Sequence, residues 1–280
     1  MPDQKRFNVS LFNKEHLLAL KEITENNADL PIARIYLNAD LAFDEEILSI
    51  CRSVKELVPE AEWILELPKI LRKGDTAYLE RVSNLTNGSS MFQGVLIGNL
   101  EAAGFFDEKS SQIKLYGDHN LYLWNSKAVE EWGNLLSGGC LPLELRREEL
   151  QEILKMSFLW EKVVYGRIPM MVTANCVAKT NGNCPAPPNE SFKLRDRMGK
   201  DFPVCRNCTH CYNVIYNSLP LSLHGSLSKY ADDILLRIAF TTEGKREALQ
   251  VLSYFLLGLW ERNVPFSGEY TTGHEKRGAL

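Results

Sequence analysis

Several features that would identify a protein's chemistry at once are missing from this sequence. There is no G-x-S-x-G, H-E-x-x-H or P-loop pattern, and no G-x-G-x-x-G follows a predicted strand. The sequence therefore gives no support to the common hydrolases, the NTP-binding proteins or the dinucleotide-binding enzymes.

Long hydrophobic runs are missing as well. The longest one near the C-terminus extends from Val251 to Trp260, is interrupted by Ser253 and Gly258, and is too short to span a bilayer. The first residues, MPDQKRFNVSLF, contain no apolar core followed by small residues, so we expect no signal peptide. These absences lead us to expect a cytoplasmic protein with no membrane partner.

An excess of charge of one sign is also absent. The chain has 280 residues, of which 32 are Lys or Arg and 36 are Asp or Glu, so its formal net charge is −4. A surface with this balance has no overall attraction for nucleic acid. Apolar residues make up 45% of the chain, which is enough for one large domain with a sizeable core.

Short apolar runs alternate with helical patterns along most of the chain. The predicted strands are residues 8–12, 33–37, 63–67, 94–97, 113–116, 141–145, 162–165 and 234–240. The predicted helices are residues 14–25, 44–57, 74–85, 126–136 and 147–156. Alternation repeated about eight times predicts the α/β class and a (β/α)8 TIM-like barrel. An open doubly wound sheet is the alternative.

The alternation stops after Tyr165. Residues 166–223 are rich in Pro, Asn, Gly and Cys, which predicts a cysteine-rich insertion after strand seven. In a barrel this insertion lies at the C-terminal face, where barrel enzymes place their chemistry. Met198-Gly199-Lys200 predicts a hairpin turn inside it. We therefore expect the first seven β/α units in residues 1–165, and the last strand, a closing helix and a tail in residues 224–280.

Five of the seven cysteines lie inside this insertion, at Cys176, Cys184, Cys205, Cys208 and Cys211. The last three form a double C-x-x-C, which can turn thiolates toward one metal. Four thiolates are enough for a tetrahedral zinc site or a [4Fe-4S] cluster, and a dithiol redox switch is a third interpretation. Spacing alone does not separate zinc from iron–sulfur. The ligands that we expect are Cys176, Cys184, Cys208 and Cys211.

Cys205 is the most dispensable of the five, because Cys208 and Cys211 already form a pair. His210, which lies between two cysteines, is an alternative ligand.

Polar residues follow several of the predicted strands. Most of the asparagines there suit helix N-caps. Glu66 and Glu144 are harder to explain, because carboxylates at the ends of apolar strands need a partner or a ligand. Arg167, just after strand seven, can pair with either. We therefore take Glu66, Glu144 and Arg167 as candidate catalytic residues, with Asp118 and His119 as further polar groups at the barrel mouth.

A local basic stretch lies within the insertion. It could hold the phosphates of an RNA. Asp196 and Asp201 partly neutralise it, which favours the solvated face of a hairpin instead. The basic residues are Lys193, Arg195, Arg197, Lys200 and Arg206.

Three segments carry a resemblance to the collagenase-like peptidase family, peptidase family U32. They are residues 161–176 (EKVVYGRIPMMVTANC), 194–204 (LRDRMGKDFPV) and 208–221 (CTHCYNVIYNSLPL). The TTGHEKRG segment near the C-terminus also resembles the end of the longer bacterial members. The resemblance covers most of the chain and matches the C-terminal half of those proteins.

The resemblance implies a barrel fold, a cysteine-bound [4Fe-4S] cluster and a role in the hydroxylation of tRNA or ribosomal RNA. It places Cys176 and Cys184 among the ligands. Short members carry a His before the signature Gly and a further Cys a few residues on, where this chain has Tyr165 and Pro169. Cys208 or Cys211 would then supply the missing ligand.

The partners that the resemblance implies are RNA and a separate barrel domain or subunit, corresponding to the N-terminal half of longer members. Two other classes of function stay open at this point. One is a protease, as the family name says, and the other is a non-catalytic barrel with structural zinc.

Overall fold

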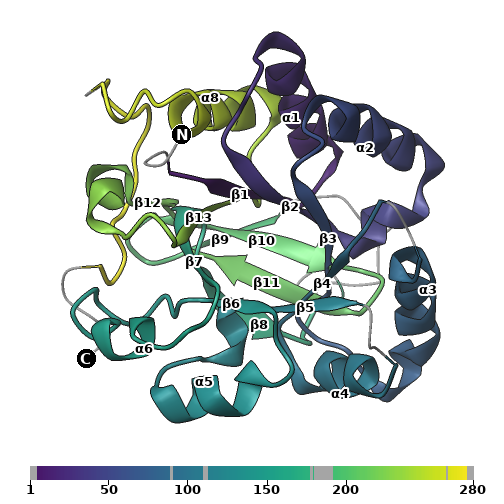
Figure 1. Ribbon diagram of the computed structural model, residues 1–280. Coiled ribbons are helices and arrows are strands. Elements are labelled where there is room, and N and C mark those ends of the chain that lie inside the picture. The colour runs from purple at the N-terminus through teal and green to yellow at the C-terminus, as the bar shows by residue number, and fades with distance from the viewer. Residues whose placement is uncertain are drawn as a thin grey trace.

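Eight parallel strands close into a barrel in the part of the chain that the computed structural model describes, residues 5–88, 91–109, 113–176, 179, 192–262 and 264–275 (Figure 1). The barrel closes because β7 pairs with both β6 and β13, and β13 pairs with β1. The predicted fold is confirmed. In chain order the strands are β1 (Phe7–Leu11), β2 (Ile32–Asn38), β3 (Glu62–Glu66), β4 (Gly94–Ile97), β5 (Lys114–Gly117), β6 (Gly138–Cys140), β7 (Trp160–Gly166) and β13 (Leu235–Ala239).

Helices surround this barrel (Figure 1). Asparagines cap three of them as expected: the side chain of Asn13 accepts a hydrogen bond from the backbone N–H of His16, that of Asn99 from Ala102 and that of Asn125 from Ala128. No helix among the described residues is both long and apolar enough to cross a membrane. The helices are α1 (Lys14–Asn26), α2 (Glu45–Leu57), α3 (Thr76–Thr86), α4 (Leu100–Lys109), α5 (Ser126–Gly133), α6 (Gln151–Leu154) and α8 (Lys245–Leu256), with short 3-10 helices at η1 (Ala39–Phe43), η2 (Lys73–Asp75), η3 (His119–Leu121) and η4 (His224–Lys229).

The chain between β7 and β13 builds a second, antiparallel sheet, which we call the inserted sheet. Its described strands run in the order β8 (Pro169–Thr173), β11 (Tyr212–Tyr216), β10 (Asp201–Asn207) and β9 (Phe192–Arg195). Strand β12 (Leu221–Ser222) then returns antiparallel to β7. The predicted hairpin is confirmed at Gly199, which has φ +77° and sits between β9 and β10.

Two predicted elements differ from the structure. The strand predicted at 141–145 is wrong, since the sixth strand is the Gly-Gly-Cys segment 138–140. A Cβ on Gly138 would lie 2.7 Å from the carbonyl oxygen of Leu159, and one on Gly139 would lie 2.6 Å from a Leu123 methyl. Packing therefore requires glycines, which propensity assigns to turns. The helix predicted at 147–156 shortens to 151–154, and α4 was not predicted.

Candidate active site at the barrel mouth

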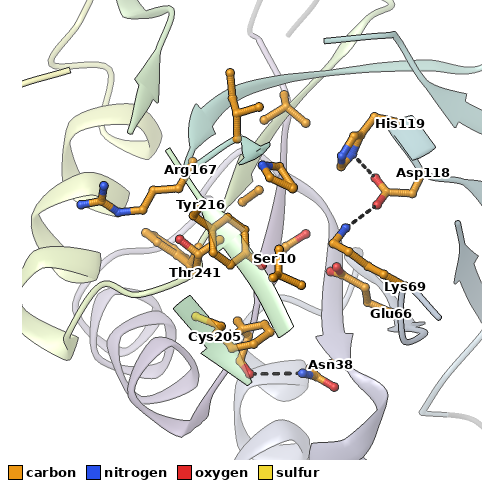
Figure 2. Close-up of a pocket in the computed structure, with 18 of the residues that line it drawn as sticks. Ser10, Asn38, Glu66, Lys69, Asp118, His119, Arg167, Cys205, Tyr216 and Thr241 are labelled. Atoms are coloured by element: carbon orange, nitrogen blue, oxygen red, sulfur yellow. Dashed lines mark hydrogen bonds and ion pairs between the residues drawn. The ribbon is translucent and has the colours of Figure 1, made fainter. Parts of the chain in front are cut away.

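A cavity of about 80 Å³ lies where the inserted sheet covers the C-terminal ends of the barrel strands. Figure 2 shows side chains from both layers meeting there. The main polar lining from the barrel is Glu66, Lys69, Asp118, His119 and Arg237, and the inserted sheet adds Cys205, Arg206, Asn207, Tyr212 and Tyr216.

Arg237, in the middle of β13, forms the floor of this cavity. Its Nη1 lies 2.8 Å from Oδ1 of Asp118 and 3.1 Å from Oε1 of Glu161, and its Nη2 lies 3.2 Å from Oε2 of Glu66. Its Nε donates to Oγ of Ser10 at 2.8 Å. Burial opposes the charge, but the three carboxylates outweigh it and raise the pKa of Arg237 well above its ordinary value. A permanent cation thus ties β13 to residues from four other parts of the barrel.

Asp118 is held as an anion beneath His119. Burial disfavours its charge, yet His119, Arg237 and Lys69 together keep the pKa of Asp118 well below its usual range. An ionised carboxylate only accepts hydrogen bonds, so Nδ1 of His119, 2.9 Å from Oδ1 of Asp118, carries the proton. In the neutral tautomer that this contact selects, Nε2 of His119 is the nitrogen without a proton. Lys69 approaches the other carboxylate oxygen at 3.6 Å (Figure 2).

A second polar layer lies deeper in the barrel. Glu161 accepts hydrogen bonds from Nδ2 of Asn8 at 2.6 Å and from the hydroxyl of Tyr36 at 2.7 Å. Arg34 donates to that same hydroxyl at 3.0 Å and to Glu62 at 3.1 Å. Barrel interiors are usually filled by branched apolar side chains. Here the interior holds a network of paired charges in which Arg34 and Glu161 are buried and Glu62 is half-buried.

The three candidate catalytic residues fall in different places. Glu66 lines the cavity beside Arg237. Arg167 also lines it, but its guanidinium donates to Oγ1 of Thr242 and to the carbonyls of Asn217 and Ser218, and Figure 2 shows it directed outward. Glu144 is not among the described residues that line the cavity. The structure therefore brings Glu66 and Arg167 to one cavity without Glu144, and their catalytic roles stay predictions.

Arg237 and Glu161 are the site residues that sequence reasoning missed. Both lie inside strands that were predicted from their apolar content, at 234–240 and next to 162–165. A charged side chain in the middle of an otherwise buried strand must find a partner. That signal was present in the sequence, although it does not say which strands supply the partners.

Cys205 is separate from the cysteines around it. It lines the cavity next to Tyr216, whereas Cys208 and Cys211 are exposed in the turn between β10 and β11 (Figure 2). Burial is the main cause that raises the pKa of the Cys205 thiol to about 12. Cys205 is therefore a neutral thiol at ordinary pH.

Cys176 leaves the inserted sheet at the same end as this turn. Strand β8 pairs with β11 so that Thr173 lies opposite Asn213, and the Asn213 side chain donates to the carbonyl of Asn175 at 2.8 Å. Cys176 follows Asn175 directly, three residues beyond the end of β8, and Cys211 lies immediately before the first residue of β11. Two chain segments far apart in sequence thus bring thiols toward one end of the sheet.

Cys184, the fourth of the expected ligands, lies outside the described residues. Within the described ranges, no group of three or more Cys, His, Asp or Glu side chains is arranged to hold a metal ion. The donor type nevertheless fits a soft metal, since Cys176, Cys208 and Cys211 are thiols on loops and a turn at one sheet end.

Comparison with known proteins supports the fold. The U32 peptidase Mk0906 aligns with a TM-score of 0.52 and 10% identity, over 87% of this chain and 96% of that chain. A plant class V chitinase mutant from Cycas revoluta aligns with a TM-score of 0.44 and 10% identity, over 91% of this chain and 99% of that chain. A putative fructose-1,6-biphosphate aldolase from Coccidioides immitis aligns with a TM-score of 0.40 and 16% identity, over 56% of this chain and 64% of that chain.

No model of a known protein family matches the sequence, and no curated protein does. The likeness to Mk0906 shows that the chain has a U32 peptidase-like TIM barrel fold.

Proposed function

We propose that this chain is an iron–sulfur protein of the collagenase-like peptidase type that takes part in the hydroxylation of tRNA or ribosomal RNA. Cys176, Cys184, Cys208 and Cys211 would hold a [4Fe-4S] cluster beside the covered barrel mouth. Such a cluster supplies electrons when bound. The cavity under the inserted sheet would hold the reacting group of the substrate.

The observation that carries this proposal is the pairing of β8 with β11, which directs Cys176 and the Cys208–Cys211 turn to one end of the inserted sheet. Cys211 has φ +50°, a left-handed conformation that is uncommon for a residue other than glycine. Such a backbone bends the C-x-x-C turn tightly, and a tight turn is what allows two thiolates to face one metal.

Two features of the mouth support a reaction there. His119 is oriented by an ionised carboxylate and lines the cavity, so it can accept a proton at Nε2. The β9–β10 hairpin presents exposed basic side chains that can contact RNA phosphates. These are Lys193, Arg195, Arg197 and Lys200, of which Arg195 is also paired with Asp201 at 2.6 Å.

Anaerobic purification followed by metal and sulfide analysis tests the cluster. We expect a brown protein with broad absorbance near ~400 nm and about four irons per chain. Cys208→Ser should lose the iron and the colour, while Cys205→Ser should keep both, because the half-buried Cys205 lines the cavity and lies apart from the exposed cysteines of the turn. Colourless protein with one zinc would overturn the iron–sulfur assignment and favour a structural zinc module.

RNA binding is measured separately, by titrating transfer RNA into the anaerobic protein at several salt concentrations. We expect affinity to fall as salt rises, and the slope to become shallower in a Lys193→Ala/Lys200→Ala variant, because each phosphate contact releases counterions. An affinity for transfer RNA that changes neither with salt concentration nor with these substitutions would contradict the RNA part of the proposal.

A peptidase is the second candidate, because the oriented His119 beside Glu66 could also activate water. Cleavage of gelatin by the purified chain, lost in Glu66→Gln, would favour it over RNA hydroxylation. A contaminating protease would not respond to that substitution.

A further inference from the structure

The inserted sheet spans the barrel mouth from one side to the other. It leaves the barrel at the end of β7, where Gly166 has φ +139° and a Cβ would lie 2.2 Å from the carbonyl oxygen of Ala239. Around the closed barrel the strand order is β7, β13, β1, β2, β3, β4, β5, β6, so β3 lies opposite β7. The far end of the sheet, the turn between β10 and β11, contacts the segments that follow β2 and β3.

His210 makes the central contact on that far side. Its side chain is 1% exposed, with Nδ1 at 3.1 Å from Oδ1 of Asp75 in η2 and Nε2 at 3.7 Å from Oδ1 of Asp40 in η1. These are ion-pair distances without hydrogen-bond alignment. The ring also meets Tyr78 of α3 edge-on, with centroids 4.6 Å apart. A buried imidazole held between two carboxylates fixes the turn to the barrel.

Backbone contacts reinforce the same attachment. Arg72 donates to the carbonyl of His210, and its other terminal nitrogen lies 3.4 Å from the carbonyl of Cys211. The Asn207 side chain accepts from the N–H of His210 at 2.8 Å and donates to Asp40 at 3.3 Å. The turn is therefore held by η1, η2 and the residue before η2 at once.

We propose that the inserted sheet is a lid, rooted at Gly166 and latched on the opposite side by His210 and Arg72, and that metal bound at Cys208 and Cys211 closes the latch. Metal binding and the latch are coupled through the sequence, because Cys208 and Cys211 flank His210. When both cysteines bind one metal, the backbone of His210 between them is fixed. The cavity beneath the sheet, about 80 Å³, is far below the ~300–1,000 Å³ of ordinary ligand pockets, so a substrate of ordinary size fits there only when the lid moves away. The coupling rests on the proposed function, whereas the lid and its latch do not.

Cys205 reports on lid opening, because it lines the cavity beneath the sheet. Trypsin cleaves after Lys200 and Arg206, so Cys205 is alone in the peptide 201–206. The measurement is the initial rate of iodoacetamide labelling of that peptide by mass spectrometry, under anaerobic conditions. We expect slow labelling in the wild type and a rate about tenfold higher in His210→Ala. Arg195→Ala, which breaks an exposed ion pair on the same sheet, is the matched control and should label like the wild type.

Cys208→Ser should raise the labelling rate as much as His210→Ala, and the double variant no further. Arg72→Met, which removes only the contacts to backbone carbonyls, repeats the test should His210→Ala fail to fold. Equal rates in the wild type and the latch variants overturn the lid. Faster labelling in His210→Ala without a change in Cys208→Ser overturns only the coupling to metal. A wild type that holds no metal defeats the proposed function, while the His210→Ala comparison still decides the latch.

Discussion

The barrel interior and the cysteine turn of the inserted sheet use polar chemistry in opposite ways. Inside the barrel, Arg237 and Glu161 are 3% exposed and each contacts several partners from other strands. In the turn, Cys208 and Cys211 are exposed. A buried network depends on all of its members, because any charge left without a partner is costly. An exposed side chain can be replaced without disturbing the core. We therefore expect the first region to determine stability, whereas the second is the one in which we propose that a metal binds.

Removing Arg237 should give the largest effect on stability. Arg237→Met leaves Asp118, Glu161 and Glu66 facing one another without their shared cation. We expect a loss of about 3–5 kcal/mol in the free energy of unfolding, measured by urea denaturation. Arg195→Ala is the control, since it removes an exposed ion pair and should leave the unfolding midpoint unchanged. Equal urea midpoints in Arg237→Met and Arg195→Ala would show that the buried network contributes no more to stability than an exposed ion pair does.

Gly166, where the inserted sheet leaves the barrel, should give the next effect. Gly166→Ala places a Cβ 2.2 Å from the Ala239 carbonyl oxygen at a backbone φ of +139°. We expect about 2–3 kcal/mol of destabilisation from strain and displacement. Gly74→Ala is the matched control, because a Cβ there meets nothing within 4 Å. Similar thermal midpoints for both variants would mean that the root of the inserted sheet is loosely packed.

The pH dependence of stability should separate the regions again. The pKa of Asp118 is depressed in the folded protein, so the unfolded chain binds its proton first as pH falls. The stabilisation that Asp118 provides is therefore complete above about pH 4 and is lost progressively below it. Urea midpoints measured from pH 7 to pH 3 should fall less steeply in Asp118→Asn than in the wild type. Parallel curves would show that Asp118 is not held as an anion.

The smallest effect on stability is expected in the cysteine turn. In metal-free protein, Cys211→Ser should leave the free energy of unfolding within about 0.5 kcal/mol of the wild type, because the side chain is exposed. The same substitution should abolish metal binding, as judged by metal content after anaerobic reconstitution. A large loss of stability in the metal-free variant would place Cys211 in the core of the sheet instead.

Sequence reasoning recovered the barrel because apolar strands and amphipathic helices keep their own periods, 2 and 3.6 residues. It missed β6, whose Gly138 and Gly139 are required by close packing and carry no strand signal. In the site it identified Glu66 and the cysteine-rich insertion, since both depart from their local pattern. It could not identify the contacts of Arg237 or of His210, because both depend on which strands lie opposite each other in the closed barrel.

Anomalous X-ray scattering at the iron and zinc edges, on crystals grown anaerobically, tests most directly whether thiols from separate segments share one centre. For the shared centre that we propose, we expect a strong iron-edge peak at the end of the inserted sheet, within bonding distance of the sulfurs of Cys176, Cys208 and Cys211. A peak at the zinc edge alone, or sulfurs that bind nothing in common, would contradict it.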